Sequence, residues 1–198
     1  MRTLEEAGLE ASTCVRCRLS QGRTQVVYGT GSPDADLMFI GEGPGYHEDK
    51  QGEPFVGAAG QLLNQMLAEI EVSRQDVYIA NVIKCRAPGN RDPLPDEIEA
   101  CSPYLLEQVA LIDPRIIVTL GNFATRFVLN KPVSISRVRG QRFTWQGRTV
   151  IPTYHPAAVL HGGGAASSQM TALRVDFQEI RAALAERPEP VEEQLGLF

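Results

Sequence analysis

The apolar residues of the chain gather into four short runs, separated by segments with helical spacing. The runs lie at residues 37–40, 77–80, 116–120 and 149–154. Apolar runs of this length are typical of parallel strands that are covered on both faces. Residues 60–70 place their apolar side chains on one helical face, and Pro95 begins a second helix with acidic residues behind it. This alternation predicts a three-layer α/β/α sandwich around a central four-stranded, mainly parallel sheet.

Three further segments complete the pattern of elements. Asn122 is placed to cap a third helix, residues 143–150 resemble a hairpin before the last strand, and residues 169–186 form a closing helix. A chain of 198 residues with 43% hydrophobic content can bury one substantial core. We therefore expect one domain at residues 1–186 and a disordered tail, rich in Pro and Glu, at residues 187–198.

The charge distribution narrows the range of partners. A net charge of −5 argues weakly against nucleic-acid binding, but much of the negative charge lies in the segment 186–193. Arg137, Arg139 and Arg142 lie in a stretch without acidic residues and form a candidate DNA-binding patch. The chain has no apolar run long enough for a membrane span, and its first residues are too polar for a secretory signal. We expect a cytoplasmic monomer with no membrane partner.

Three polar loops follow strands of the predicted sheet, at residues 41–57, 81–91 and 155–164. Ligands of parallel sheets bind beyond the carboxyl ends of the strands, which is where these loops lie. The first loop is long, and a loop of this length is uncommon unless it is functional. The sequence therefore predicts the active or binding site at this edge of the sheet.

Each feature of these loops also has a structural explanation. The GEGPG sequence at residues 41–45 is similar to a dinucleotide-binding turn, but Tyr46 replaces the third glycine of that motif and Pro44 has no amide hydrogen. The dinucleotide interpretation therefore fails, and a tight turn remains an alternative. Taken singly, His155 and Asn81 could each be structural residues at the end of a strand.

Together the three loops resemble the motifs of the family 4 uracil-DNA glycosylases. Those enzymes carry G-E-G/A-P-G, E-D, P-F-V-G, a segment that begins with Asn and contains K-C-R, and H-P-A. This chain has GEGPG, ED, PFVG, NVIKCRAPGNRDP and HPA in the same order, at residues 41–45, 48–49, 54–57, 81–93 and 155–157. The resemblance runs from about Cys14 to Ala185. It implies that the protein hydrolyses the N-glycosidic bond of uracil in DNA and leaves an abasic site for base excision repair.

The four cysteines of the chain are Cys14, Cys17, Cys85 and Cys101. A disulfide framework is not expected in a chain without a secretory signal. Four thiolates could hold zinc or a cubic iron–sulfur cluster, or the cysteines could be unrelated buried residues, and their spacing does not decide between these. The resemblance implies that they ligate one 4Fe–4S cluster with a structural role.

The resemblance also implies roles in a pocket for uracil that has been flipped out of the DNA. Phe55 stacks on the base, and the Asn81 carboxamide accepts from uracil N3–H and donates to O4. Glu48 crowds C5 of the base and excludes the methyl group of thymine. His155 donates to O2 as negative charge develops there, helped by amides of the loop that contains Gly43.

Two further assignments concern the water and the DNA. Glu42 is the candidate for orienting or activating the attacking water or for stabilising the sugar cation, although glycosylases with a GQDP sequence carry their aspartate where this chain has Gly43. Leu160 is the candidate wedge that enters the DNA stack, and His161 lies beside it. The glycines at residues 162–164 depart from the family pattern, which leaves the identity of the wedge open.

Two other classes of function are alternatives to a glycosylase. Some relatives trap uracil-DNA without turnover, through a histidine in an insertion after the second strand. This chain has no histidine between Cys85 and Cys101, so turnover is favoured. An iron–sulfur electron carrier would not need Asn81, His155 and Phe55 at one edge of a sheet.

The last five residues, QLGLF at 194–198, resemble the motif by which bacterial proteins bind the replication sliding clamp. Gln194 would anchor one edge of the motif, while Leu195, Leu197 and Phe198 would fill an apolar pocket. The alternative is that these apolar side chains fold back onto the domain. Besides uracil-containing DNA, we therefore expect the clamp as a partner, which would place the enzyme at the nucleoid of a prokaryote.

Overall fold

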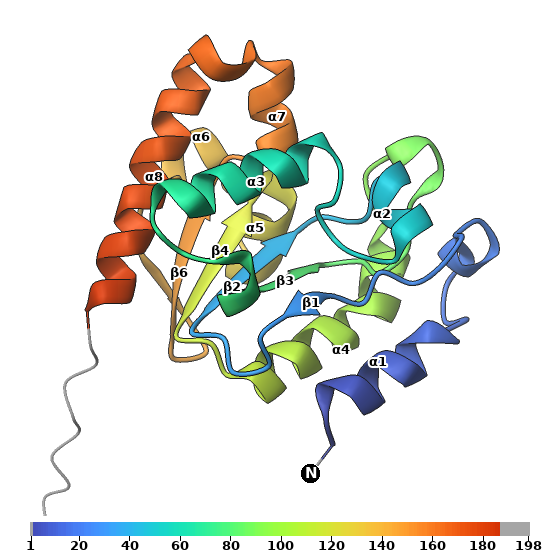
Figure 1. Ribbon diagram of the computed structural model, residues 1–198. Helices are drawn as coiled ribbons and strands as arrows, with labels where there is room; N and C mark the ends of the chain where they lie inside the picture. Colours follow the sequence, from blue (N-terminus) through green and yellow to red (C-terminus); the bar gives the residue numbers. More distant parts are fainter. Residues whose placement is uncertain (1, 187–198) are drawn as a thin grey trace, which may run out of the picture.

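The computed structural model describes residues 2–186 and contains one six-stranded sheet with the order β1-β3-β2-β4-β6-β5 (Figure 1). The four inner strands are parallel to one another. They are β2 (Leu37–Gly41), β3 (Tyr78–Asn81), β4 (Ile116–Leu120) and β6 (Arg148–Thr153). These are the four strands predicted from the sequence, and the predicted α/β class is confirmed.

Two short antiparallel strands widen the sheet beyond the predicted four. At one edge β5 (Phe143–Trp145) pairs with β6, and this pair is the predicted hairpin. At the other edge β1 (Thr30–Gly31) pairs with Ile79 and Tyr78 of β3. The sequence did not indicate β1, because a pairing of two residues shows no periodicity.

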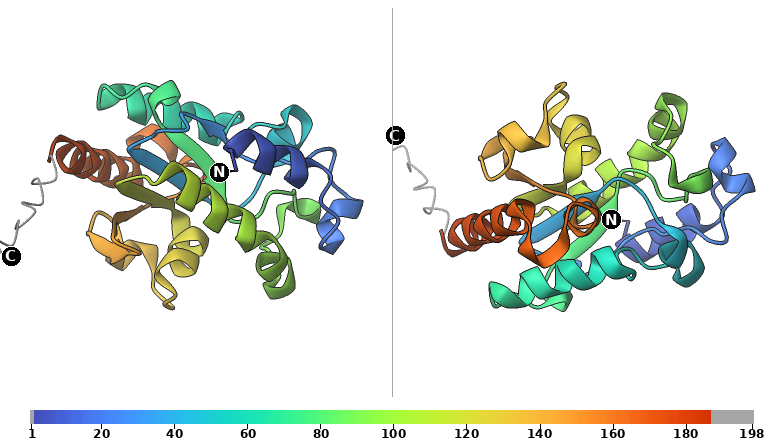
Figure 2. Two further views of the ribbon diagram at one scale, coloured as in Figure 1. Left: turned by 90° about the horizontal axis from the view of Figure 1, so that it is seen from below. Right: turned by 90° about the horizontal axis from the view of Figure 1, so that it is seen from above.

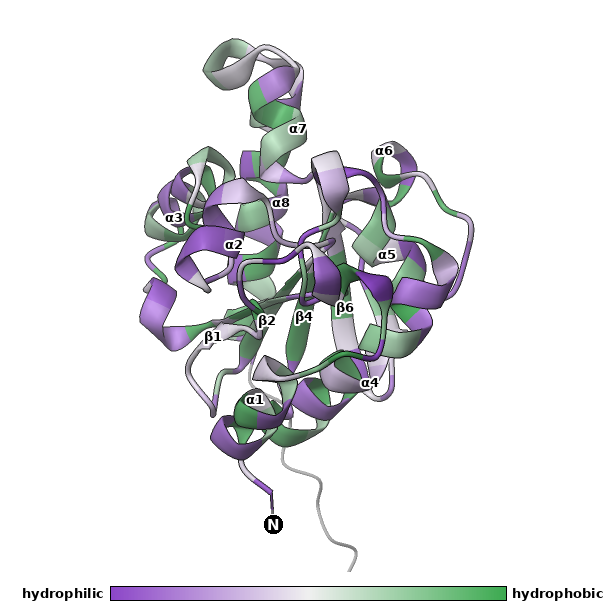
Figure 3. Cartoon of the chain, turned by 90° about the vertical axis from the view of Figure 1, so that its right-hand side faces the viewer, coloured by the Kyte–Doolittle hydropathy of each residue, from purple (hydrophilic) through white to green (hydrophobic). Residues whose placement is uncertain are grey.

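Helices cover both faces of the sheet, as Figure 2 shows. On one face lie α3 (Ala58–Glu69), α7 (Pro156–His161) and α8 (Ser168–Ala185). On the other lie α1 (Leu4–Ser12), α4 (Pro95–Ile112) and α5 (Gly121–Leu129). Alternate residues of β2 supply both cores, since Phe39 packs with the first layer and Met38 with the second. Figure 3 shows the resulting green, apolar strands between helices whose outer faces are purple.

The strand order creates a crevice at the carboxyl edge of the sheet. The chain passes from β2 to β3 on one side and afterwards to β4 on the other side of β2. Loops that leave neighbouring strands in opposite directions open a ligand site between them. The first polar loop also contains α2 (Tyr46–Gln51), which the sequence had not indicated.

Several short helices, and the residue at which α5 begins, differ from what the sequence predicts. The segments η1 (Arg18–Gln21), η2 (Arg74–Asp76), η3 (Pro88–Asn90) and η4 (Gly164–Ala166) are 3-10 helices, and α6 (Ile135–Val138) is a single turn. The predicted cap role of Asn122 is wrong, because α5 follows β4 directly and its N-cap position is Leu120. Asn122 Oδ1 instead accepts a hydrogen bond from the backbone N–H of Ile135, at 2.8 Å, where α6 begins.

The residues predicted as a tail, 187–198, lie outside the described residues, and so does the clamp-like motif at 194–198. None of the helices in the described part of the chain combines the length and apolar character that a membrane crossing requires.

Candidate active site

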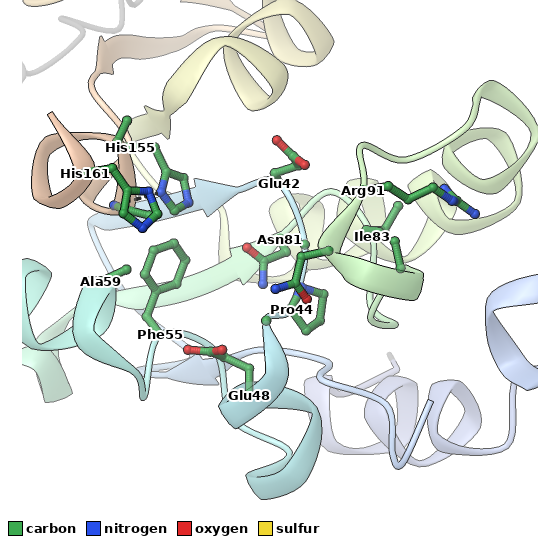
Figure 4. Close-up of a pocket in the computed structure, with 16 residues that line it drawn as sticks. Glu42, Pro44, Glu48, Phe55, Ala59, Asn81, Ile83, Arg91, His155 and His161 are labelled. Atoms are coloured by element: carbon green, nitrogen blue, oxygen red, sulfur yellow. Dashed lines mark hydrogen bonds between the residues drawn. The ribbon is translucent and has the colours of Figure 1, made fainter. Parts of the chain in front are cut away.

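A cavity of about 470 Å³ opens at the carboxyl edge of the sheet, between the three predicted loops (Figure 4). Its walls come from the GEGPG loop, the loop before α3, the loop after β3 and helix α7. The predicted residues that line it are Glu42, Gly43, Glu48, Phe55, Asn81, His155 and His161. The structure thus gathers at one cavity the residues for which the sequence predicted contact with the base.

The floor of the cavity depends on Gly41 at the end of β2. A Cβ atom at Gly41 would lie 2.4 Å from Asn81 Oδ1 and 2.8 Å from the Phe55 ring. Real Cβ atoms do not approach other atoms so closely, so only glycine leaves room for both side chains. Gly43 has a similar constraint, since its Cβ would lie 2.7 Å from Cγ1 of Ile83.

Asn81 ends β3 and presents an unsatisfied polar atom to the cavity. The residue is only 1% exposed, and its side-chain Oδ1 has no hydrogen-bond partner among the described residues. A buried acceptor left unpaired costs about 1–3 kcal/mol. An N–H donor of a bound ligand would remove that cost.

Phe55 is held over the cavity by a strained loop. Its backbone φ is +55°, in the left-handed region that aromatic residues rarely adopt, and strain of this kind clusters at functional sites. The Oε1 atom of Glu48 accepts from the backbone N–H groups of both Val56 and Gly57 at 3.0 Å. The Glu48 carboxylate and the Phe55 ring are therefore fixed relative to each other.

His155 precedes α7 and is held in one tautomer. Its Nδ1 accepts a hydrogen bond from the backbone N–H of Ala157 at 3.2 Å. Burial lowers the pKa of His155 to about 4, while the negative charge of Glu48 acts in the opposite direction. The imidazole is therefore neutral near pH 7 and carries its single proton on Nε2. Its ring centroid lies 5.6 Å from that of Phe55.

Glu42 follows β2 and lies on the opposite side of Asn81 from Glu48 in Figure 4. Burial raises the pKa of Glu42, and the nearby charge of Asp92 adds to this effect. A carboxylate with a raised pKa is a better proton acceptor. The Glu42 carboxylate thus lies at the cavity, directly after β2, the strand that pairs with the strand of Asn81.

Lys84 is a buried cation that the sequence analysis did not single out. It is 1% exposed, and its Nζ donates to the backbone carbonyl of Asn81 and to Gln108 Oε1. Burial lowers the pKa of Lys84, and the neighbouring Cys101 acts in the opposite direction. The sequence signal for its burial is that this lysine stands among the apolar residues Val82, Ile83 and Cys85.

All four cysteines line a second, smaller cavity, together with Arg23 and Lys84. Arg23 Nη1 donates to Cys85 Sγ at 3.5 Å, and the backbone N–H of Lys84 donates to Cys101 Sγ at 3.1 Å. Burial raises the pKa of the Cys85 thiol to about 11. Within residues 2–186 no three or more His, Cys, Asp or Glu side chains are arranged to hold a metal ion. Four sulfurs around one cavity, two of them accepting N–H hydrogen bonds, suit a group held by several thiolates.

The predicted arginine patch is largely neutralised by helix α8. Arg139 Nε donates to Asp176 Oδ2 at 2.9 Å, and Asp176 is fully buried. Arg142 pairs with both Glu179 and Glu186. Two of the three predicted arginines therefore serve ion pairs within the chain, and these pairs could not be foreseen because the acids follow 37 to 44 residues later.

The remaining predicted DNA contacts lie on the surface. Arg137 is exposed on α6. Leu160 is 37% exposed on α7 and does not line the cavity, whereas His161 does. Leu160 is therefore next in sequence to a residue that lines the cavity, whereas Arg137 lies on a separate helix, α6.

A different cationic surface lies beside the cavity. Tyr46, which is 51% exposed at the start of α2, lies below the Lys50 ammonium at 5.9 Å and the Arg86 guanidinium at 5.1 Å from its ring centroid. Neither cation forms an ion pair with a carboxylate in the part of the chain that is described. We call Tyr46, Lys50 and Arg86 the basic rim.

Comparisons with known proteins agree with this geometry. The family model of the uracil DNA glycosylase superfamily matches residues 28–178. A type-4 uracil-DNA glycosylase of Sulfurisphaera tokodaii is 48% identical over 190 residues, which cover 91% of this chain and 84% of that protein. One of Archaeoglobus fulgidus is 47% identical over 169 residues, or 81% and 85% of the two chains. One of Thermotoga maritima is 50% identical over 149 residues, or 74% and 78%.

These matches include the loops that form the cavity, and they agree with the α/β architecture around it. This chain therefore belongs to the uracil-DNA glycosylase superfamily and, within it, to the type-4 uracil-DNA glycosylases.

Proposed function

We propose that this protein flips uracil out of DNA and hydrolyses its N-glycosidic bond, giving free uracil and an abasic site. The observation that carries this proposal is the buried, unpartnered Oδ1 of Asn81 in a cavity that also holds Phe55 and the neutral His155. Such a set provides an acceptor, an aromatic face and a donor for one planar, polar base.

Recognition of uracil rests on the Asn81 carboxamide. Its Oδ1 accepts from uracil N3–H, and its NH₂ group donates to O4. Cytosine offers an acceptor at N3 and a donor at C4, so both contacts are lost or repulsive. Reading a base with such a paired contact is worth about 1–3 kcal/mol of discrimination.

Thymine is excluded by the rigidity of the loop around Phe55. The Glu48 carboxylate, held by the amides of Val56 and Gly57, crowds C5 of a base that stacks on Phe55. Because Glu48 is anchored by two hydrogen bonds, it cannot turn away without leaving both amides unpaired. The methyl group of thymine therefore meets a fixed obstacle.

Cleavage moves the electrons of the bond between C1′ and N1 onto the base, which leaves positive charge on the sugar. His155 Nε2–H donates to uracil O2 as that oxygen gains negative charge. Water then adds to C1′ and Glu42 accepts its proton, while the departing uracil anion takes up a proton from the solvent. The Glu42 carboxylate also stabilises the positive charge that develops on the sugar.

The proposal extends to the cysteine cavity. Cys14, Cys17, Cys85 and Cys101 hold one 4Fe–4S cluster, which when bound would tie the N-terminal segment to the loop after β3. The shared cavity and the N–H donors on two of its sulfurs support this ligand set. Visible absorbance with four irons per chain is the expected measurement, whereas a colourless protein with one zinc would contradict it.

On the DNA, Leu160 is the proposed wedge, and His161 contacts the strand beside the flipped nucleotide. The exposed position of Leu160 on α7, next to a cavity wall, supports this role. Arg137 remains a proposed phosphate contact. For Arg139 and Arg142 the ion pairs with α8 favour a structural role over the DNA contact expected from the sequence.

Two further parts of the proposal rest on sequence and composition. The segment QLGLF at 194–198 binds the replication sliding clamp, and the enzyme acts as a cytoplasmic monomer. Removal of these five residues should abolish clamp binding and leave excision on short oligonucleotides unchanged. Normal clamp binding by the shortened chain would refute the motif.

The decisive experiment uses oligonucleotides that carry one uracil, with matched thymine and cytosine controls. Free uracil and alkali-sensitive abasic sites should form from the uracil strand alone, with many turnovers when DNA is in excess. A stable complex of protein and uracil-DNA without released base would instead identify a binding module.

A further inference from the structure

Lys84 is a charged residue in the interior of the domain, close to both cavities but with a side chain that faces neither substrate nor solvent. Its Nζ lies 2.8 Å from the backbone carbonyl oxygen of Asn81 and 2.5 Å from Gln108 Oε1. Gln108 is itself fixed by donating to the carbonyl of Tyr28 and to the hydroxyl of Tyr78. The Gln108 acceptor is therefore held in place by other parts of the fold.

Burying an ammonium group is unfavourable, so its position calls for a reason. An apolar side chain of equal length would fill the same volume without that cost. The reason lies at the end of β3, where β1 pairs only with Ile79 and Tyr78 and does not extend to Asn81. The Asn81 carbonyl therefore takes its hydrogen bond from Lys84 rather than from a neighbouring strand.

The orientation of the Asn81 backbone determines where its carboxamide points. The tolerance is small, because the space beside Asn81 Oδ1 is so narrow that Gly41 cannot carry a Cβ atom. Misplacement of a recognition group by about 1 Å can lower a rate about a hundredfold. A bond that fixes this carbonyl therefore acts directly on base recognition.

The main chain of Lys84 also forms hydrogen bonds, one of them to a cysteine of the second cavity. Its N–H donates to Cys101 Sγ at 3.1 Å, and its carbonyl accepts from the N–H of Val27 at 2.8 Å. One residue thus joins a cysteine through the backbone and the uracil-reading asparagine through the side chain. The side-chain bond can be removed by substitution while the main-chain bonds remain.

We infer that Lys84 is a positioning residue for uracil recognition: its ammonium fixes the Asn81 backbone and transmits to the pocket the rigidity of the cysteine-bearing segment. This inference rests on the proposed function of Asn81. It goes further in assigning base selectivity to a residue that touches neither base nor sugar.

The substitution Lys84→Met tests this, because Met occupies the space of the apolar part of the lysine side chain, from Cβ to Cε, and lacks the Nζ donor. We expect the single-turnover rate on uracil-DNA to fall about 10- to 100-fold, as for loss of a charged hydrogen bond. The preference for uracil over cytosine should fall as well. Arg23→Met is the matched control, since Arg23 contacts Cys85 in the same cavity but does not contact Asn81.

A double-mutant cycle with Asn81→Ala separates positioning from general support of the fold. In the Asn81→Ala background, Lys84→Met should lower the excision rate by less than a further factor of about two, because both changes act through the Asn81 carboxamide. An equal effect of Lys84→Met in both backgrounds would overturn the inference. So would wild-type excision and selectivity in Lys84→Met, or an equal loss of selectivity in Arg23→Met.

Thermal stability and visible absorbance of each variant show whether the fold and the cysteine site persist. If Lys84→Met does not fold, Gln108→Met removes the second anchor of the ammonium, and the same cycle with Asn81→Ala is applied to it. The ratio of binding affinities for uracil-DNA and cytosine-DNA is measured in parallel. If the wild type binds but does not cut, the proposed turnover fails, while this ratio still tests Lys84.

Discussion

His155 and Ala157 form the hydrogen bond that sets the chemistry of the pocket: the Ala157 N–H donates to Nδ1 of the imidazole, at 3.2 Å. This bond leaves the single proton of the neutral ring on Nε2. Burial lowers the His155 pKa to about 4 and keeps the ring neutral near pH 7. A neutral donor strengthens its bond as charge develops on O2 and does not need to be protonated first.

The first prediction concerns pH. Because the folded-state pKa of His155 lies below its ordinary value of 6.5, the unfolded chain binds a proton first as the pH falls. The stability contributed by this site is therefore present above pH 6.5 and is lost as the pH falls toward about 4. The single-turnover rate should show no step near 6.5, and ¹⁵N shifts should report an Nε2–H tautomer at pH 6. An imidazolium signal at pH 6 would contradict this assignment.

Replacement of the same residue tests its role in catalysis. His155→Ala should lower the single-turnover rate about 100- to 1000-fold, while affinity for uracil-DNA changes little. The loss is expected in the rate because the bond to O2 strengthens mainly in the transition state. A parallel loss of rate and affinity would make His155 a DNA contact instead.

The second residue to test is Asn81, through the substitution Asn81→Asp. A carboxylate cannot donate to O4, and a protonated carboxyl matches the pattern of cytosine, so the uracil-to-cytosine rate ratio should fall. Asn90→Asp is the control, because Asn90 also lines the cavity but is exposed. Unchanged selectivity in Asn81→Asp would remove Asn81 from base reading.

Much of this site could be predicted from the sequence, because the order of the motifs along the chain fixes which loops meet at one edge of a parallel sheet. Asn81 is the last residue of β3 and His155 lies just beyond β6, and an apolar run marks each of these strands clearly. The part that could not be predicted depends on three-dimensional contacts between distant residues. The bond from Lys84 to Asn81 and the pairing of Arg139 with Asp176 are of this kind.

The fourth prediction separates the basic rim from the arginine patch. We expect Lys50 and Arg86 each to contact one phosphate, so Lys50→Gln with Arg86→Gln should weaken DNA binding and reduce the log–log slope of its salt dependence by about 1.4–1.8. Arg139→Met should instead lower thermal stability, since it leaves Asp176 buried without its partner, at a cost of about 3–5 kcal/mol. A reduced salt slope in Arg139→Met with normal stability would restore the arginine patch as the DNA contact.

The last prediction concerns Gly41, whose missing side chain provides the space in which Asn81 and Phe55 meet. The φ of Gly41 is not in the left-handed region, so alanine at this position is opposed by contact alone. Its Cβ would push on Asn81 Oδ1 and on the Phe55 ring, the two groups proposed to read the base and to stack on it. Gly41→Ala should therefore lower excision by at least about a hundredfold, in keeping with an ångström-scale displacement of recognition groups.

Gly22→Ala is the matched control for this substitution, because a Cβ at Gly22 meets no atom within 4 Å. It should leave excision and thermal stability unchanged. Single-turnover rates on a uracil oligonucleotide, measured beside thermal unfolding, distinguish a blocked pocket from a destabilised fold. The packing explanation is wrong if Gly41→Ala retains the wild-type rate, or if its loss of activity follows only from unfolding.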